Sequence, residues 1–445
     1  MVVHCRSLSF HSIFCLLRCL MDKIINAKDF GFLPENSGES NAVALQNALD
    51  NGGIIRVSVA GEYALSECVF IGDNTTLIFE EGVTIIRQPS KTGINGNVLI
   101  NKGAFEGITN HNIKIVGLHL LCNGVESTGF GVTAKKVGLR AQVAFLHIEH
   151  LEIVDFSCVG LLEKDYGVQI SAFNDIRLDG LYIEGNKDGV HLGWGKNFII
   201  RNGKFKTFDD PIALNAFDYS VSNTHVGWIE NGIIENCYDL ADDTTTGYFC
   251  RILGGAWTAW KKGMLVHHSD TVVYKNKIYR VVMNPTDGKL YKSETPPSHA
   301  KGIQEYDGIN WNYTQDGELY DCGCRNILLK DIHLQKVRSI AVAIDLNYDT
   351  YARSFTEGST PLPQGNITFD NVQIEADIKT FFRANYPVEN IAIKNCNLKD
   401  AKILFEGFPL KGLSYPPVQL TIENSTLDES TIFFDKHHKV TVKKC

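Results

Sequence analysis

The chain has 445 residues and a net charge of −8, and its 44% hydrophobic and 21% charged residues are typical of an ordinary globular protein. No basic stripe runs through it, so we expect no nucleic-acid partner. No stretch of about 20 apolar residues that would cross a membrane is present either. A chain of this length suits one long all-β or solenoid domain that carries an insertion.

Twelve cysteines are spread along the chain, which predicts buried, reduced thiols instead of a disulfide framework. Only Cys322 and Cys324 are closely spaced, and without a second pair they predict side chains on one strand rather than a zinc site. Residues 1–20 resemble a signal peptide, but Arg18 interrupts the apolar run and no cleavage site follows. We therefore expect a non-native start or a poor leader, a globular protein from Met21, and a cytoplasmic location in preference to a secreted one.

The first predicted elements lie between residues 26 and 90. Residues 41–50 have apolar side chains at helical spacing, and Gly52-Gly53 ends this helix. Strand-like runs follow at residues 54–59, 63–65, 75–79 and 83–86. The succession of Asp-Phe-Gly, the helix with Ala-Leu-Gln, and Gly-Gly-x-Ile resembles the N-terminal helical cap and first coils of the pectin-lyase-like right-handed β-helix proteins.

A repeated pattern in the rest of the chain supports the same fold. The unit is Asn-x-apolar-x-apolar-x, then Asn, Asp or Gly, then apolar-x-apolar, and the shortest intervals between clean copies are about 23–29 residues. The copies lie at residues 112–120, 146–153, 174–183, 197–205, 230–237, 326–334, 366–374, 390–398 and 418–427. Each copy predicts two short strands joined by a bend, where Asn and Asp tolerate a left-handed backbone. The predicted fold class is an all-β, right-handed parallel β-helix with a short N-terminal helical cap.

Residues 256–319 interrupt this pattern and predict a small inserted β module between β-helix parts at residues 21–255 and 320–445. The insert is rich in aromatic residues, namely Trp257, Trp260, Tyr274, Tyr279, Tyr291, Trp311 and Tyr313. Its first half is similar to small carbohydrate-binding modules of the chitin-binding type, and its second half resembles a motif of phage tail proteins. The aromatic rings either stack on sugars or build the core of the module.

Two aspartates mark the expected site. Asp188 and Asp210 lie 22 residues apart, and each opens a run of a small residue, an apolar residue, any residue and leucine. They are therefore expected at one position of two successive coils, about 4.8 Å apart. Asp209 adds a third carboxylate. Crowded carboxylates cannot all ionise easily, so that one of them retains a proton for acid/base chemistry.

The acidic motifs resemble glycoside hydrolase family 28, the polygalacturonase-like enzymes. The chain has Asn186-Lys187-Asp188-Gly189, then Asp209-Asp210, then a lone His225, and then Arg251-Ile252-Leu253. The resemblance implies an inverting glycosidase without a cofactor or metal. Asp209 would be the general acid, and Asp188 and Asp210 would activate the water. Leu253 replaces the lysine that grips a uronic carboxylate in this family, which argues against a galacturonan substrate.

Further residues are predicted to contact a polysaccharide or oligosaccharide substrate. They are Asn186, His191, Trp194, His225 and Arg251, and additional candidates are Asp242, Asp243, Asp345 and Tyr348.

Three alternatives remain open at this stage. The protein could be a non-catalytic, tail-spike-like carbohydrate-binding β-helix, or a calcium-dependent polysaccharide lyase, for which no lysine base is expected in place. The aspartates could also be turn residues or a structural calcium site.

Overall fold

The computed structural model describes residues 24–93, 95–126, 139–219, 223, 225–242, 246–349, 352–408 and 412–445. The predicted leader at residues 1–20 lies outside these ranges, as does Asp243. Within the described ranges, no helix is long and apolar enough to span a membrane.

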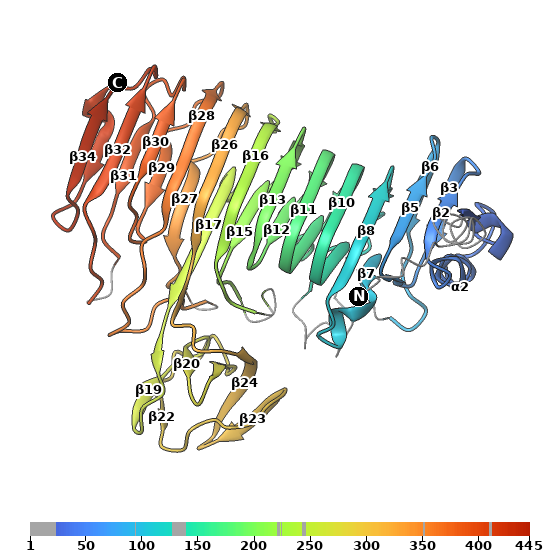
Figure 1. The fold of residues 1–445 in the computed structure, drawn as a ribbon, viewed down its shortest axis with the longest axis horizontal. Helices are drawn as coiled ribbons and strands as arrows, with labels where there is room; N and C mark the ends of the chain where they lie inside the picture. The colour runs from blue at the N-terminus through green and yellow to red at the C-terminus, as the bar shows by residue number, and fades with distance from the viewer. Residues whose placement is uncertain are drawn as a thin grey trace, which may run out of the picture.

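The body of the molecule is a right-handed parallel β-helix, which confirms the predicted fold class (Figure 1). One column of stacked strands, here called the site column, carries the candidate site. It consists of β4 (Val69–Ile71), β7 (Leu99–Asn101), the start of β10 (Val143–Leu161) and of β11 (Val168–Gly185), β12 (Val190–Leu192), β15 (Ile212–Asn215), β17 (Cys250–Ala256), β27 (Ile340–Leu346), β29 (Thr380–Ala384), β31 (Lys402–Phe405) and β33 (Ile432–Phe434). Neighbouring strands of this column run parallel.

Two further columns close each coil. The longer one contains β1 (Ile24–Asn26), β2 (Gly53–Val57), β5 (Thr75–Phe79), β8 (Asn110–Val116), the middle of β10 and β11, β13 (Gly195–Arg201), β16 (Ile229–Asp239), β26 (Cys324–Leu334), β28 (Gly365–Ile374), β30 (Ile391–Lys394), β32 (Val418–Glu423) and β34 (Val440–Lys444). The shorter one contains β3 (Gly61–Leu65), β6 (Val83–Arg87), β9 (His119–Leu121), the ends of β10 and β11, and β14 (Lys204–Thr207). Inward-facing aliphatic and aromatic side chains of the columns form one continuous buried core.

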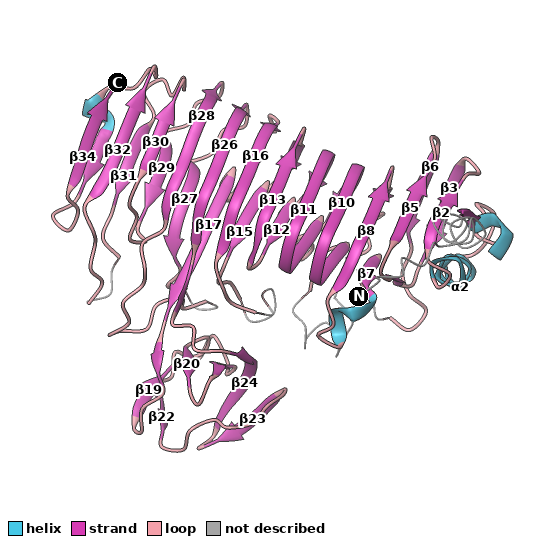
Figure 2. Ribbon diagram, viewed as in Figure 1, coloured by secondary structure: helices cyan, strands magenta, loops and turns pink. Residues whose placement is uncertain are grey.

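Short helices cover the ends of the fold and one coil (Figure 2). They are η1 (Ala27–Phe30), α2 (Gly38–Leu49), η2 (Lys102–Phe105) and η3 (Glu429–Thr431). Helix α2 confirms the predicted helix but begins three residues earlier, because the Ser37 side chain accepts a hydrogen bond from Ser40 N and caps the first turn.

The bends between strands confirm the role predicted for asparagine. Asn197, Asn231, Asn326 and Asn366 all have a left-handed backbone, with φ between 54° and 60°. Each of their side-chain amides donates to the carbonyl of the asparagine one coil below, and the ladder begins at Asn174. Asparagine therefore fixes the corner and also links successive coils.

Residues 258–316 form two small sheets that extend from the end of β17 (Figure 1). The first sheet contains β18 (Thr258–Ala259), β20 (Thr271–Val273), β21 (Lys277–Val281), β23 (Ile303–Tyr306) and β24 (Ile309–Asp316), and the second β19 (Met264–Val266) and β22 (Tyr291–Ser293). At the base of the insert, β17 pairs antiparallel with β25 (Asp321–Cys322).

The aromatic residues of the insert contribute mainly to its own packing. Trp311 and Tyr279 are fully buried in its core, and Trp260, Tyr274, Tyr291 and Tyr313 pack partly buried against that core. Trp257 is buried as well, and its indole nitrogen donates to Leu319 O at 2.6 Å. Of the two interpretations of these rings, the structure favours the structural one.

Candidate active site

The register of the site column brings the predicted aspartates together. Val190 pairs with Ile212, and Gly189 N donates to Asp210 O at 2.9 Å, so Asp188 and Asp210 occupy equivalent positions in successive coils. Ala213 pairs in turn with Arg251 in the next coil. The predicted stacking of these coils is therefore confirmed.

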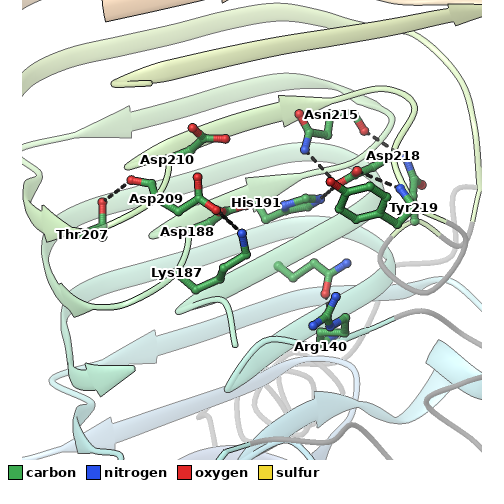
Figure 3. Close-up of polar contacts among 12 residues, drawn as sticks. Arg140, Lys187, Asp188, His191, Thr207, Asp209, Asp210, Asn215, Asp218 and Tyr219 are labelled. Carbon is green, nitrogen blue, oxygen red and sulfur yellow. Dashed lines mark hydrogen bonds and ion pairs between the residues drawn. The ribbon is translucent and has the colours of Figure 1, made fainter. Parts of the chain in front are cut away.

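Oxygen atoms of Asp188, Asp209 and Asp210 lie within 4.8 Å of one another, and we call this group the carboxylate cluster (Figure 3). Asp188 and Asp210 are buried, whereas the Asp209 side chain is 20% exposed. Tyr248 N donates to Asp210 Oδ1 at 2.7 Å. Asp209 is thus the member of the cluster that solvent can reach most directly.

Lys187 lies in the cluster, which the sequence analysis did not foresee. Its ammonium donates to Asp209 Oδ2 and lies 3.8 Å from Asp188 Oδ1. Lys187 immediately precedes Asp188, and Asp209 immediately precedes Asp210. The Lys187 and Asp209 side chains are therefore stacked one coil apart, and this spacing in the sequence could have predicted their contact. A lysine therefore lies beside the carboxylates, but it is not the lysine base that a lyase would need, because its ammonium group stays protonated. Because an ammonium group already balances part of the negative charge here, the cluster differs from an open calcium site.

The three carboxylates differ in proton affinity. Burial alone would raise the pKa of Asp188, but the charge of Lys187 and the hydrogen bond with His191 outweigh it and lower this pKa below its usual value. Burial and the charge of Asp188 raise the pKa of Asp209, although Lys187 acts in the opposite direction. Burial and both neighbouring carboxylates hold the pKa of Asp210 well above its usual value. The cluster therefore combines an ionised carboxylate with carboxyl groups that retain protons more readily.

Lys187 itself is unsuited to act as a base. Burial would lower its pKa, but the charges of Asp188 and Asp209 outweigh burial and raise it, so the ammonium group stays protonated.

Replacing Lys187 by methionine is expected to raise the pKa values of Asp188 and Asp209, because the ammonium charge lowers both. Carboxyl ¹³C NMR titration of protein labelled at aspartate measures this directly. Lys206→Met is the matched control, since Lys206 contacts Glu184 at 3.6 Å on the surface of the neighbouring column. Unchanged titration of Asp209 in Lys187→Met would contradict the assigned ion pair.

His191 connects the cluster to a second buried acid. Its Nδ1 lies 3.0 Å from Asp188 Oδ2, its Nε2 lies 3.5 Å from Asp218 Oδ2, and its ring stacks on Tyr166 at 4.3 Å. His191 is only 1% exposed, so it lies behind Asp188 and not at the surface where a substrate would bind. Asp218 was missed in the sequence because it lies in the segment after β15, outside the repeat. Together these contacts fix the orientation of Asp188.

Two arginines extend the site along the same face. Arg251 lowers the pKa of all three cluster carboxylates and donates from Nη2 to Asn347 Oδ1 at 2.6 Å. Ala343 pairs with both Arg251 and Arg383, so Arg383 faces outward in the same row two coils further on. Arg383 donates to Asp345 Oδ2 at 2.5 Å and to the Tyr248 hydroxyl at 3.1 Å. Leu253 is fully buried opposite Asp345.

Two predicted site residues, His225 and Trp194, lie away from the cluster, and a third, Asn186, lies at the turn next to it. His225 packs against His147 with ring centroids 5.1 Å apart, and burial lowers its pKa to about 4. His147 lies at the bend of β10 where the site column ends, between Leu146, which pairs with Ser171, and Ile148, which pairs with Phe173. Trp194 lies at the equivalent bend of a later coil, so both residues are at the end of the site column opposite to the cluster. Trp194 instead lines a separate hollow of 410 Å³. Asn186 is exposed at the turn before Lys187, where its backbone N–H donates to Leu161 O at 2.8 Å.

A buried brace lies beneath the cluster. The Arg338 guanidinium contacts Asp239 at 2.7 and 3.0 Å, and it also donates to Thr207 O at 3.2 Å and Thr246 O at 2.6 Å. Lys336 Nζ donates to the same Thr207 carbonyl at 2.6 Å and lies 3.8 Å from Asp242. The brace thus holds both chain segments that enter the cluster, one leading to Asp209 and one to residue 247.

The fold and the site define a right-handed parallel β-helix protein with an acidic cluster on one outer face. No known family profile matches the chain, and no curated protein matches it. The chain is similar to the polygalacturonase from Erwinia carotovora, with 12% identity, a TM-score of 0.48, and coverage of 92% of this chain and 95% of that one. It is also similar to the adhesin PfbA of Streptococcus pneumoniae, with 13% identity, a TM-score of 0.42, and coverage of 95% and 100%.

A third similar structure is ORF18 of Geobacillus virus E2, with 13% identity and a TM-score of 0.47. The alignment covers 96% of this chain but only 63% of the viral protein. All three similarities concern the fold alone.

Proposed function

We propose that the protein is a glycoside hydrolase that cleaves a glycosidic bond of a polysaccharide or oligosaccharide with the carboxylate cluster. The observation that carries this proposal is the divergence of proton affinity within the cluster. The pKa of Asp188 is lowered, while those of Asp209 and Asp210 are raised. Neighbouring titratable groups whose pKa values are pushed apart are characteristic of an acid and its partner base.

Asp209 is proposed as the general acid, because it combines a raised pKa with the most exposed position in the cluster. Asp188 and Asp210 would hold and activate the attacking water, which inverts the anomeric centre. Inversion is proposed from the sequence motif and not from the distances. The cluster oxygens lie within 4.8 Å of one another, which is closer than the roughly 6.5–9.5 Å typical of the two carboxyl groups of inverting enzymes. Proton NMR of the first anomer released decides between inversion and retention.

The substrate is proposed to be a saccharide other than plain galacturonan. Leu253 is fully buried and carries no charge, so the site lacks the lysine that would grip a uronic carboxylate at this position. Arg251 and Asn347 offer polar groups for hydroxyl contacts beside the cluster instead. Asn186, exposed at the turn before Lys187, is a further candidate for a hydroxyl contact.

A glycan screen tests the proposal. The purified protein is incubated with homogalacturonan, xylogalacturonan, rhamnogalacturonan and arabinoxylan, and new reducing ends are measured alongside ultraviolet absorbance. Reducing ends without an unsaturated uronide, resistant to a chelator, are expected. Ultraviolet-absorbing products that disappear with chelator would identify a lyase, and binding without any cleavage would identify a non-catalytic carbohydrate-binding protein.

Replacing Gly247 by alanine is expected to abolish most of the hydrolytic activity while the β-helix stays folded. Gly247 has φ of 65°, and a Cβ there would lie 2.5 Å from Asp210 Oδ1 and closer still to Asp209 Oδ1. The added methyl group must therefore displace both carboxylates. Activity assays and circular dichroism check the result, with Gly107→Ala as the control, because Gly107 has a similar φ of 68° but no atom near its Cβ. Equal activity of the two variants would contradict the close packing over the cluster.

A further inference from the structure

A cavity of 360 Å³ lies between the inserted module and the β-helix. His267, Asp287 and Lys289 line it from the module, and Tyr348, Asp349 and Arg353 line it from the hairpin after β27. Its volume falls in the range of about 300–1,000 Å³ that is typical of small-molecule sites. The cavity therefore exists only because the insert packs against the solenoid.

Both walls of this cavity are held in place. Arg353 Nε donates to Asp270 Oδ1 of the module at 3.2 Å, and Arg353 N donates to Ser269 Oγ at 3.3 Å. Tyr348 forms a β-bridge with Arg353, which closes the hairpin. The module is thus tied directly to the hairpin that forms the opposite wall.

Further contacts fix the module to the segment between β15 and β16. Arg280 is buried with its guanidinium 4.3 Å from the centroid of Phe217, next to Asp218. Gln315 exchanges two hydrogen bonds with the backbone of Val226, at 2.8 and 3.0 Å. The module is consequently built into the face that carries the site and is not suspended from a loose linker.

Contacts between neighbouring residues connect this cavity with the carboxylate cluster. Arg251, which acts on all three cluster carboxylates, donates to Asn347, and the next residue, Tyr348, lines the cavity. Tyr219 reports the same proximity, because burial and the charges of Asp218 and Asp349 raise its pKa to about 12. The cavity and the cluster are thus joined through Arg251, Asn347 and Tyr348 on the same face, which is the direction in which a long saccharide bound at the cluster would extend.

The lining has the chemistry that recognises a sugar ring. Tyr348 is 45% exposed, while the Arg353 guanidinium lies 4.6 Å from its ring centroid and Phe408 packs edge-on against it at 6.0 Å. Because the guanidinium covers one face of the phenol, the exposed remainder of the ring is the apolar surface that can contact sugar C–H groups. The donors Lys289 and His267 and the acceptors Asp287 and Asp349 line the same cavity. Hydrogen-bond donors and acceptors are present in similar number, and this balance suits the hydroxyl groups of a sugar better than an anion or a purely apolar ligand.

We propose that this cavity is a distal sugar-binding subsite, in which Tyr348 holds a ring of the same saccharide chain that the carboxylate cluster cleaves. The proposal rests on the proposed hydrolase function. It makes the insert a determinant of substrate length: chains long enough to reach Tyr348 bind more tightly than short ones, and the module does not act as a separate binding domain.

Affinity electrophoresis of the full chain tests the subsite separately from catalysis. The Asp209→Asn protein serves as the parent, and the gels contain homogalacturonan, xylogalacturonan, rhamnogalacturonan or arabinoxylan. We expect the parent to be retarded in at least one gel, and Tyr348→Ala to weaken that affinity about tenfold, as loss of one aromatic stacking contact does elsewhere. Tyr320→Ala is the matched control, because Tyr320 is 42% exposed and does not line the cavity.

Equal retardation of the Tyr348→Ala and Tyr320→Ala proteins would overturn the subsite, and so would the absence of retardation of the parent in every gel. Tyr348-dependent binding by a wild-type protein that releases no reducing ends would uphold the subsite and refute the hydrolase instead. In an active enzyme, Tyr348→Ala is expected to raise KM for long chains and leave kcat and short substrates unchanged.

Discussion

Replacing Asp209 by asparagine is expected to lower the rate of glycan hydrolysis about 100- to 10,000-fold, the usual contribution of a general acid. The amide cannot deliver a proton to the leaving oxygen, whereas it keeps the size of the side chain and its place beside Lys187. Burial and Asp188 raise the pKa of Asp209, so its proton is retained to higher pH than in a free carboxyl group and is lost as the pH rises. The wild-type rate should therefore fall on the alkaline side, and this limb should disappear in Asp209→Asn.

Measurement of kcat over a range of pH checks this prediction, with Asp377→Asn as the control. Asp377 is an exposed acid that forms a surface ion pair with Lys379 at 2.8 Å. Glycans with an activated leaving group provide a second check, because a good leaving group needs little protonation and should restore much of the rate. A variant that retains full activity on native glycans would remove Asp209 from the mechanism.

The fold and the stacking of the aspartates were accessible to sequence analysis for one physical reason. Each coil returns to the same face, so a repeat of inward-facing apolar residues fixes which positions lie above one another. Asp188 and Asp210 follow this register, and so does Arg251. Lys187 follows it too, but its effect depends on the direction of a long flexible side chain, which the repeat does not specify.

Residues outside the repeat were also misplaced or missed. His225 lies in the segment between β15 and β16, and nothing in its spacing shows that this segment carries it to His147 at the far corner. Arg338 is 131 residues from Thr207 and 99 residues from Asp239 in sequence, so only the coils between them bring these groups together. Long-range contacts of this kind are set by the assembled solenoid and not by local pattern.

Replacing Arg338 by methionine is expected to destabilise the protein by about 3–5 kcal/mol, the usual cost of leaving one partner of a buried ion pair alone. Arg338 and Asp239 have fully buried side chains. Burial already raises the pKa of Asp239 although Arg338 opposes it, and without the guanidinium its carboxylate keeps the more distant charge of Lys336 but loses its hydrogen-bonded partner. Urea unfolding measures the loss, with Arg325→Met as the control, because Arg325 pairs with Glu230 at the surface.

The double variant Arg338→Met with Asp239→Leu separates stability from positioning. An apolar pair of similar volume should recover most of the lost stability, since no unpaired charge remains buried. Activity should nevertheless stay low, because the Thr246 carbonyl loses the hydrogen bond from Arg338, and the Thr207 carbonyl keeps the hydrogen bond from Lys336 but loses the one from Arg338. Thr207 Oγ1 donates to Asp209 O at 2.9 Å, and Thr246 N donates to Phe208 O at 2.9 Å, so these two segments set the place of Asp209 and of Gly247 above it. A stable double variant with wild-type kcat would show that the guanidinium stabilises the fold without positioning the cluster.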